Sequence, residues 1–238
     1  MTPSSHLSDN LVLLAHETSL LMATAAGLND ETVRAASICV GWTRAHVLSH
    51  IARNADALGN LASWAITGTP VAMYKSPQAR DADIASGSTR SAQEIYADLQ
   101  ASAARFASAA PGLAGPPESR EVEMRAGRIV LGGQLPTLRL MEVVFHHVDL
   151  DAGYTFADAD HGFVKRAIGN AVTRMTSNGQ QLGILLRGDH GDTWSIGDGA
   201  EDPQEVTGSN AALLLWLARG IDAGLSSEAS LPKLPSWG

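Results

Sequence analysis

The stretch MEVVFHHVDL, residues 141–150, constrains the fold more than any other part of the chain. It places Glu142, His146 and Asp149 among valine, phenylalanine, methionine and leucine side chains, where an uncompensated charge is costly to bury. In a helix these three polar residues, four and three positions apart, share one face. We therefore predict an amphipathic helix whose polar stripe points into a helical bundle or a cleft.

Helical spacing of apolar residues recurs through most of the chain up to this stretch. The predicted helices cover 11–25, after a cap at Ser8 or Asp9, then 43–67, 92–110 and 135–150. Residues 70–91 are predicted to be a long loop with a short helix near 77–85, and such loops are often functional. A short extended piece is predicted at 127–134. Together these elements indicate a four-helix bundle, to which we assign residues 1–153.

The pattern changes after residue 153. A helix is predicted at 163–175, then short strands at 181–187, 192–196 and 204–207 separated by Gly-Asp turns, and finally a helix at 209–219. We assign residues 154–238 to a second, smaller domain. The predicted fold class is α+β, with an N-terminal four-helix bundle followed by a mixed α/β C-terminal domain.

The composition excludes several kinds of partner. The 238-residue chain has a formal net charge of -8 and no lysine and arginine cluster, so we expect neither a nucleic-acid partner nor binding to an anionic membrane surface. Residues 1–10 do not resemble a secretory signal, and no apolar stretch reaches the roughly 20 residues that span a bilayer. The single cysteine, Cys39, is expected to pack as a small buried hydrophobe in a cytoplasmic, reducing compartment.

Further candidate ligands lie on the second predicted helix, in TRAHVLSHIARN. His46, His50 and Asn54 follow one another at intervals of four residues, and His50 lies nearer the middle of the apolar run. Two histidines and one carboxylate form a known kind of catalytic zinc site with an open fourth position, and the same set also suits nickel or iron. A Glu and a His four apart also fit an ordinary hydrogen-bonded pair, so spacing alone leaves both interpretations open.

Other catalytic signatures are missing. The chain has no G-x-S-x-G, no G-x-x-x-x-G-K-[ST], no G-x-G-x-x-G and no H-E-x-x-H. Serine hydrolysis and nucleotide cofactors therefore lose their usual support.

Residues 41–89 and the stretch 141–150 resemble the mycothiol-dependent maleylpyruvate isomerases, a branch of the DinB-like metal-binding four-helix bundles. The resemblance implies a site for zinc, or another divalent metal, with His50, Glu142 and His146 as ligands. It also implies mycothiol as a thiol cofactor.

The resemblance further implies a role for Arg219, in LLLWLARG, as the second domain's arginine near the metal pocket. Ala218 stands where relatives commonly have glycine. A helix-terminal cation favoured by the helix dipole is the plain alternative for Arg219.

The implied reaction is the cis-trans isomerisation of maleylpyruvate to fumarylpyruvate in gentisate breakdown. Zinc would lower the pKa of the mycothiol thiol, and the thiolate would add to the double bond, allow rotation and leave. Arg219 would pair with a substrate carboxylate or stabilise developing enolate charge. Three alternatives stay open, because fold and metal site do not fix the substrate: a mycothiol or other thiol S-transferase, a zinc hydrolase, and a non-catalytic metal-binding protein.

Overall fold

A computed structural model describes residues 3–177, 183–197 and 202–234 of the chain. The chain divides into two compact units, Met1–Tyr154 and Thr155–Gly238. Within the described ranges, no helix combines the length and the apolar character needed to cross a membrane.

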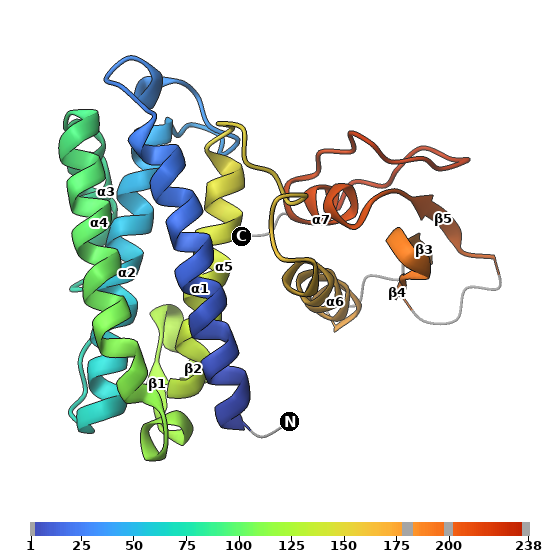
Figure 1. Ribbon diagram of the computed structural model, residues 1–238. Coiled ribbons are helices and arrows are strands. Elements are labelled where there is room, and N and C mark those ends of the chain that lie inside the picture. Colours follow the sequence, from blue (N-terminus) through green and yellow to red (C-terminus); the bar gives the residue numbers. More distant parts are fainter. Residues whose placement is uncertain (1–2, 178–182, 198–201, 235–238) are drawn as a thin grey trace. The chain divides into compact units, whose positions relative to one another are not determined.

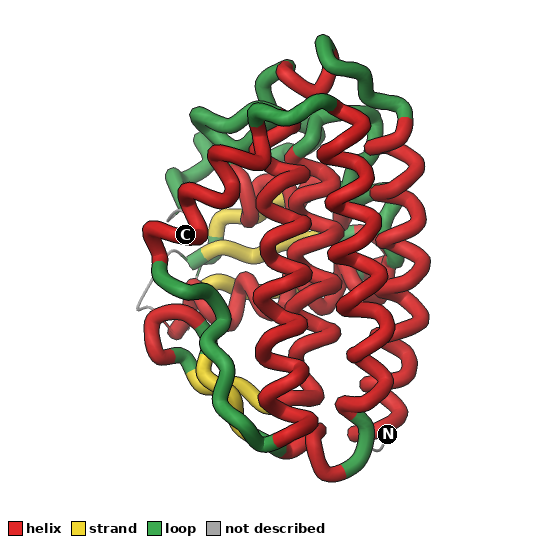
Figure 2. Tube along the Cα trace, turned by 90° about the vertical axis from the view of Figure 1, so that its left-hand side faces the viewer, coloured by secondary structure: helices red, strands yellow, loops and turns green. Residues whose placement is uncertain are grey.

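The first unit is a bundle of long helices that run side by side in both views (Figures 1 and 2). Its helices are α1 (Pro3–Ala26), α2 (Arg44–Thr67), α3 (Pro77–Ser88), α4 (Ala92–Ala109) and α5 (Leu135–Asp149). Helix α2 is central, because it packs against α4, α3 and α5, while α1 packs against α5 and α4. Fully buried Leu48, Leu61, Leu99 and Val143 belong to the core between these helices. The predicted helical bundle is confirmed.

The helix ends follow from local sequence signals. Thr43 precedes α2, and its hydroxyl lies 2.8 Å from Nδ1 of His46, which also accepts the Thr43 backbone N–H. Gly68 ends α2 in the left-handed conformation that glycine adopts without strain. The predicted capping box of Ser91 and Glu94 opens α4. These signals explain why α2 and α4 lie where the sequence predicts them.

Helix α1 begins earlier than predicted. The expected start was residue 11, after a cap at Ser8 or Asp9, whereas the helix begins at Pro3. The reason is that Leu7 extends the buried stripe of Leu14 and Leu21 by two helical turns. Proline is also tolerated in the first turn of a helix, where its missing N–H has no partner to lose.

A small hairpin lies between α4 and α5. Strand β1 (Glu121–Glu123) pairs antiparallel with β2 (Ile129–Leu131). The predicted extended piece at 127–134 contains β2, but the prediction missed β1. A three-residue strand is too short to show a periodic pattern in the sequence.

The second unit combines two helices with a three-stranded sheet. Its elements are α6 (His161–Ser177), β3 (Ile184–Arg187), β4 (Thr193–Ile196), β5 (Gln204–Thr207) and α7 (Asn210–Arg219). Strand β3 is central, antiparallel to β4 and parallel to β5, and α6 packs against α7 and β4. Each predicted element is found, although residues 181 and 182 of the first predicted strand lie outside the described residues. The α+β fold class is confirmed.

Candidate metal centre

The start of α2 and the end of α5 are tied together. The Arg44 side chain donates to the carbonyl of Leu150 at 2.7 Å, and the backbone N–H of Ile38 donates to the carbonyl of Asp149 at 2.9 Å. His50 lies in the second turn of α2, and His146 lies in the last turn of α5. The two helix ends therefore bring side chains that are 96 residues apart in sequence to one place.

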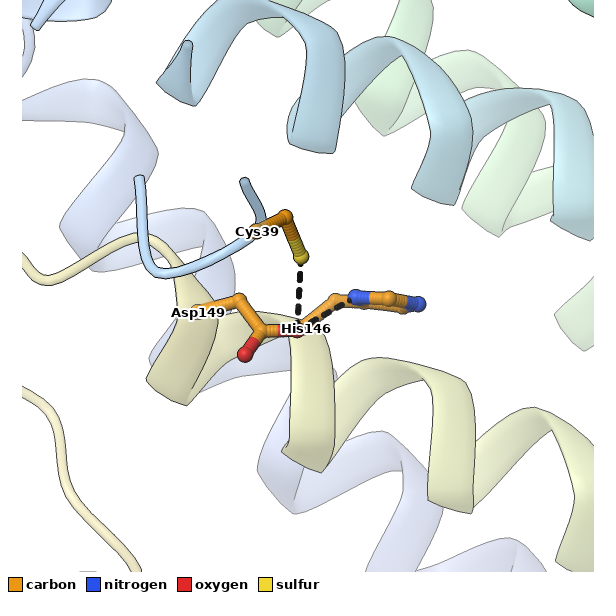
Figure 3. Close-up of side chains that lie close together, drawn as sticks. All are labelled: Cys39, His146 and Asp149. Atoms are coloured by element: carbon orange, nitrogen blue, oxygen red, sulfur yellow. Dashed lines mark hydrogen bonds and ion pairs between the residues drawn. The ribbon is translucent and has the colours of Figure 1, made fainter. Parts of the chain in front are cut away.

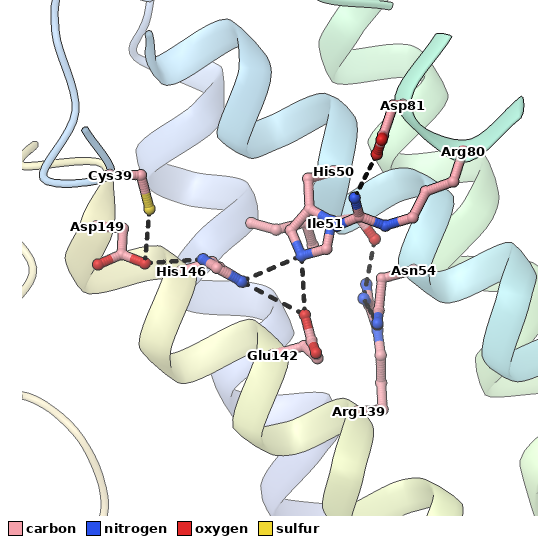
Figure 4. Close-up of polar contacts among 10 residues, drawn as sticks. All are labelled: Cys39, His50, Ile51, Asn54, Arg80, Asp81, Arg139, Glu142, His146 and Asp149. Atoms are coloured by element: carbon pink, nitrogen blue, oxygen red, sulfur yellow. Dashed lines mark hydrogen bonds and ion pairs between the residues drawn. The ribbon is translucent and has the colours of Figure 1, made fainter. Parts of the chain in front are cut away.

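His50, Glu142 and His146 converge on one point (Figure 4). Nε2 of His50 lies 2.9 Å from Oε2 of Glu142 and 3.1 Å from Nε2 of His146. The distance from Nε2 of His146 to Oε2 of Glu142 is 3.4 Å. Nitrogen and oxygen ligands of tetrahedral zinc, bound at about 2.0–2.2 Å, lie roughly 3.3–3.6 Å from one another. Small side-chain shifts would reach that spacing, so the three residues fit a divalent metal.

Asp149 holds the far side of the His146 ring (Figure 3). Its Oδ2 atom lies 2.7 Å from Nδ1 of His146, and the Asp149 side chain is fully buried. Such a carboxylate fixes the histidine tautomer and leaves Nε2 for a metal. The structure therefore supports a role for Asp149 in orienting His146.

Cys39 differs from its expected role as a buried hydrophobe. The residue is only half-buried, and its thiol donates to Oδ2 of Asp149 at 3.3 Å. Cys39, His146 and Asp149 also place three possible ligand atoms close together. Oδ2 of Asp149 already receives hydrogen bonds from Cys39 and His146. We therefore assign the group of Cys39, His146 and Asp149 to orienting the His146 ring.

The electrostatics favour an ion pair between Glu142 and His146 and a neutral His50 ring. Burial lowers the pKa of His50, and the neighbouring His146 lowers it further. Burial raises the pKa of Glu142, but hydrogen bonds from His146 and His50 outweigh this effect and hold it well below its usual value. Burial lowers the pKa of His146, but hydrogen bonding to Asp149 and the nearby Glu142 raise it well above its usual value. These directions favour an ionised Glu142 beside a protonated His146.

Two other polar residues of the second predicted helix have structural roles. His46 caps α2 and stacks on Trp42, with ring centroids 6.2 Å apart. Asn54 accepts a hydrogen bond from the buried Arg139 at 2.8 Å. Neither belongs to the converging trio.

Residues that sequence reasoning missed also surround the trio. The Trp42 ring lies 5.6 Å from the His50 ring, and an Arg80 guanidinium nitrogen lies 3.3 Å from Nδ1 of His50. Arg80 belongs to the segment 70–91, which we considered a functional candidate because it was predicted to be a long loop. Nothing in the sequence separates it from Lys75 or Arg90 in the same segment.

Arg219 lies in the second unit. It is the last residue of α7, it is half-buried, and one of its guanidinium nitrogens donates to the carbonyl of Ala218 at 2.9 Å. Gly220 follows in the left-handed conformation and ends the helix.

The fold and the site together define a helical-bundle protein with a candidate centre of two histidines and one carboxylate. Residues 14–151 match the family model of the mycothiol maleylpyruvate isomerase N-terminal domain. The chain therefore belongs to the mycothiol-dependent maleylpyruvate isomerase family, and it is an enzyme.

Two solved structures support this assignment over the full length. The chain is 31% identical to a mycothiol-dependent maleylpyruvate isomerase, with a TM-score of 0.90 and 100% of both chains covered. It is 30% identical, with the same TM-score and coverage, to a variant of such an enzyme in which a histidine is replaced by alanine. No curated protein sequence matches the chain.

Proposed function

We propose that this chain catalyses the mycothiol-dependent cis-trans isomerisation of maleylpyruvate to fumarylpyruvate. The observation that carries the proposal is the convergence of His50, Glu142 and His146, with donor atoms no more than 3.4 Å apart, inside the domain that defines the family. A divalent metal such as zinc, held by these residues, would lower the pKa of the mycothiol thiol and so supply a thiolate nucleophile at neutral pH.

The protein's own residues have separate tasks in this proposal. His50, Glu142 and His146 would hold the metal, and three protein ligands are typical of catalytic zinc sites. Asp149 accepts a hydrogen bond from Nδ1 of His146 and holds the ring in place. The Trp42 ring packs beside the His50 ring. We also propose, from the family resemblance, that Arg219 pairs with a substrate carboxylate or stabilises enolate charge in the reaction.

The test is a turnover assay on the purified full chain with zinc. Maleylpyruvate is supplied with mycothiol, with glutathione or without a thiol, and the products are separated. We expect fumarylpyruvate only with mycothiol. His50→Ala should abolish turnover, whereas His16→Ala, which removes an exposed histidine, should not.

Other products would contradict the proposal. A stable mycothiol adduct would identify an S-transferase, and hydrolysis without a thiol would identify a hydrolase. Unaltered maleylpyruvate would leave a metal-binding protein with another substrate or none.

A further inference from the structure

Arg80 is a cation at the metal centre that the three-ligand scheme does not use. It lies in the first turn of α3, which packs against α2, and its side chain is 16% exposed. One guanidinium nitrogen lies 3.3 Å from Nδ1 of His50, so it faces the back of a proposed metal ligand (Figure 4). Both residues belong to the first compact unit.

The contact between Arg80 and His50 suits only one neutral tautomer of the ring. A guanidinium can only donate, so Nδ1 of His50 must accept in this arrangement. A neutral histidine that binds a metal through Nε2 carries its proton on Nδ1, which then also donates. With a metal bound at Nε2, the Nδ1–H of His50 and the Arg80 guanidinium would both be donors and could not bond to each other. The guanidinium would then need another acceptor.

The remaining contacts of Arg80 can be exchanged at little cost. Its other terminal nitrogen lies 2.7 Å from Oδ1 of Asp81, whose side chain is 71% exposed. An ion pair with so exposed a carboxylate contributes little to stability. Arg139 differs, because its buried guanidinium donates at 2.8 Å to the Ile51 carbonyl and to Asn54 inside the core. Arg80 is therefore the more readily available of these two arginines.

Tyr74 fixes the direction of the Arg80 guanidinium. The guanidinium carbon lies 5.9 Å from the centre of the Tyr74 ring, within the range of a cation-π contact. Packing on an aromatic face turns the edge of the planar fork outward, and its two terminal nitrogens, which here contact Asp81 and His50, could pair with a carboxylate once those contacts are exchanged.

We propose that Arg80 binds a carboxylate of the ligand at this centre, which for the proposed reaction is a carboxylate of the dicarboxylate substrate. The assignment rests on the proposed function for the identity of that substrate. It makes Arg80 a substrate-binding residue on the unit that also carries the three metal ligands.

The test measures binding without turnover. Zinc-loaded protein without mycothiol is titrated with maleate, an unreactive dicarboxylate, and with its uncharged dimethyl ester, in a calorimeter. Arg80→Gln should weaken maleate binding by about tenfold or more, because a charged hydrogen-bond donor is lost. The maleate affinity of Arg80→Lys should lie between those of the wild type and Arg80→Gln, since lysine keeps the charge without the planar fork. Ester binding and zinc content should stay unchanged in both variants.

A matched control is Arg105→Gln, which removes an arginine with 59% exposure and its ion pair with Asp56 elsewhere on the bundle. It should bind maleate like the wild type. The proposal is overturned if the wild type does not bind maleate, if Arg80→Gln binds it within twofold of the wild type, or if the variant changes only zinc affinity. Turnover with mycothiol is read separately. An inactive wild type whose maleate binding depends on Arg80 would refute the isomerase function and still support this binding site.

Discussion

At the scale of single residues, the polar stripe on α5 is explained by pairing. Glu142 is ionised between two imidazoles, and His146 is bonded on its other side to the fully buried Asp149. Each buried charge thus has an opposite charge or a hydrogen-bond donor, which offsets the cost of removing it from water. The spacing of Glu142 and His146 could be recognised in the sequence. The approach of Arg80 could not, because it depends on how α3 packs against α2.

Asp149→Asn should weaken zinc binding by roughly 10–100-fold, because the amide cannot hold the His146 ring as a carboxylate does. Competition with a fluorescent zinc chelator measures this change. Cys39→Ser is the matched control, since it alters the other hydrogen bond to Asp149 and should keep zinc binding and most turnover. Equal zinc affinity in Asp149→Asn and the wild type would show that Asp149 does not orient a ligand.

Arg219→Lys should lower kcat/KM for maleylpyruvate by roughly tenfold or more with saturating mycothiol, because lysine keeps the charge but lacks the planar fork. Zinc content and the melting temperature should barely move. If Arg219 only stabilises the C-terminal end of α7 through the helix dipole, lysine should do so about as well. Arg219→Lys would then show wild-type turnover.

At the scale of helices and strands, the best predictions came from ends with local chemistry. The Ser91 and Glu94 capping box, and Gly68 at the end of α2, act on backbone groups within a few residues, so the sequence alone shows them. The start of α1 was misplaced because Leu7 continues the stripe of Leu14 and Leu21 to the N-terminal side of the expected cap. Strand β1 was missed because three residues are too few to show a periodic pattern.

The α2–α4 contact includes a carboxylate whose loss should be measurable. Asp98 on α4 receives hydrogen bonds from Arg53 on α2, at 2.6 Å, and from Arg90. Burial raises the pKa of Asp98, but these arginines outweigh it and hold the pKa below its usual value. A depressed carboxyl pKa contributes stability above the unfolded pKa of about 3.9, and this contribution is lost as the pH falls through the folded pKa.

Asp98→Asn should therefore lower the free energy of unfolding by about 1–2 kcal/mol at pH 7. The difference from the wild type should shrink below about pH 4, where the wild-type carboxyl also becomes protonated. Urea unfolding of both proteins across this pH range provides the measurement. Asp81→Asn, at an exposed ion pair, should change stability little at either pH. A difference for Asp98→Asn that does not depend on pH would contradict the assignment.

At the scale of the whole molecule, the fold class and the family could be predicted from the sequence, because long helices and two extended motifs carry them. The family resemblance implied that His50, Glu142 and His146 converge, but residue spacing alone could not show it, since the trio joins the start of α2 to the end of α5. A metal at this point would bridge the two helices as well as serve the chemistry.

Removing the metal should therefore lower stability. A ligand that binds only the folded state adds about 4 kcal/mol when it is present at 1,000 times its Kd. We expect chelation to lower the melting temperature and zinc to restore it, whereas Glu142→Gln should respond only weakly to either treatment. Identical melting curves for chelated and zinc-loaded wild type would contradict a metal bridge between α2 and α5.

We propose that His50, Glu142 and His146 hold a metal that binds the mycothiol sulfur. The most direct measurement is X-ray absorption at the zinc edge, on zinc-loaded protein before and after mycothiol is added. We expect only nitrogen and oxygen neighbours, at about 2.0–2.2 Å, before addition, and one new sulfur neighbour at about 2.3 Å afterwards. A zinc spectrum that does not change with mycothiol, or one that already contains sulfur from Cys39, would contradict it.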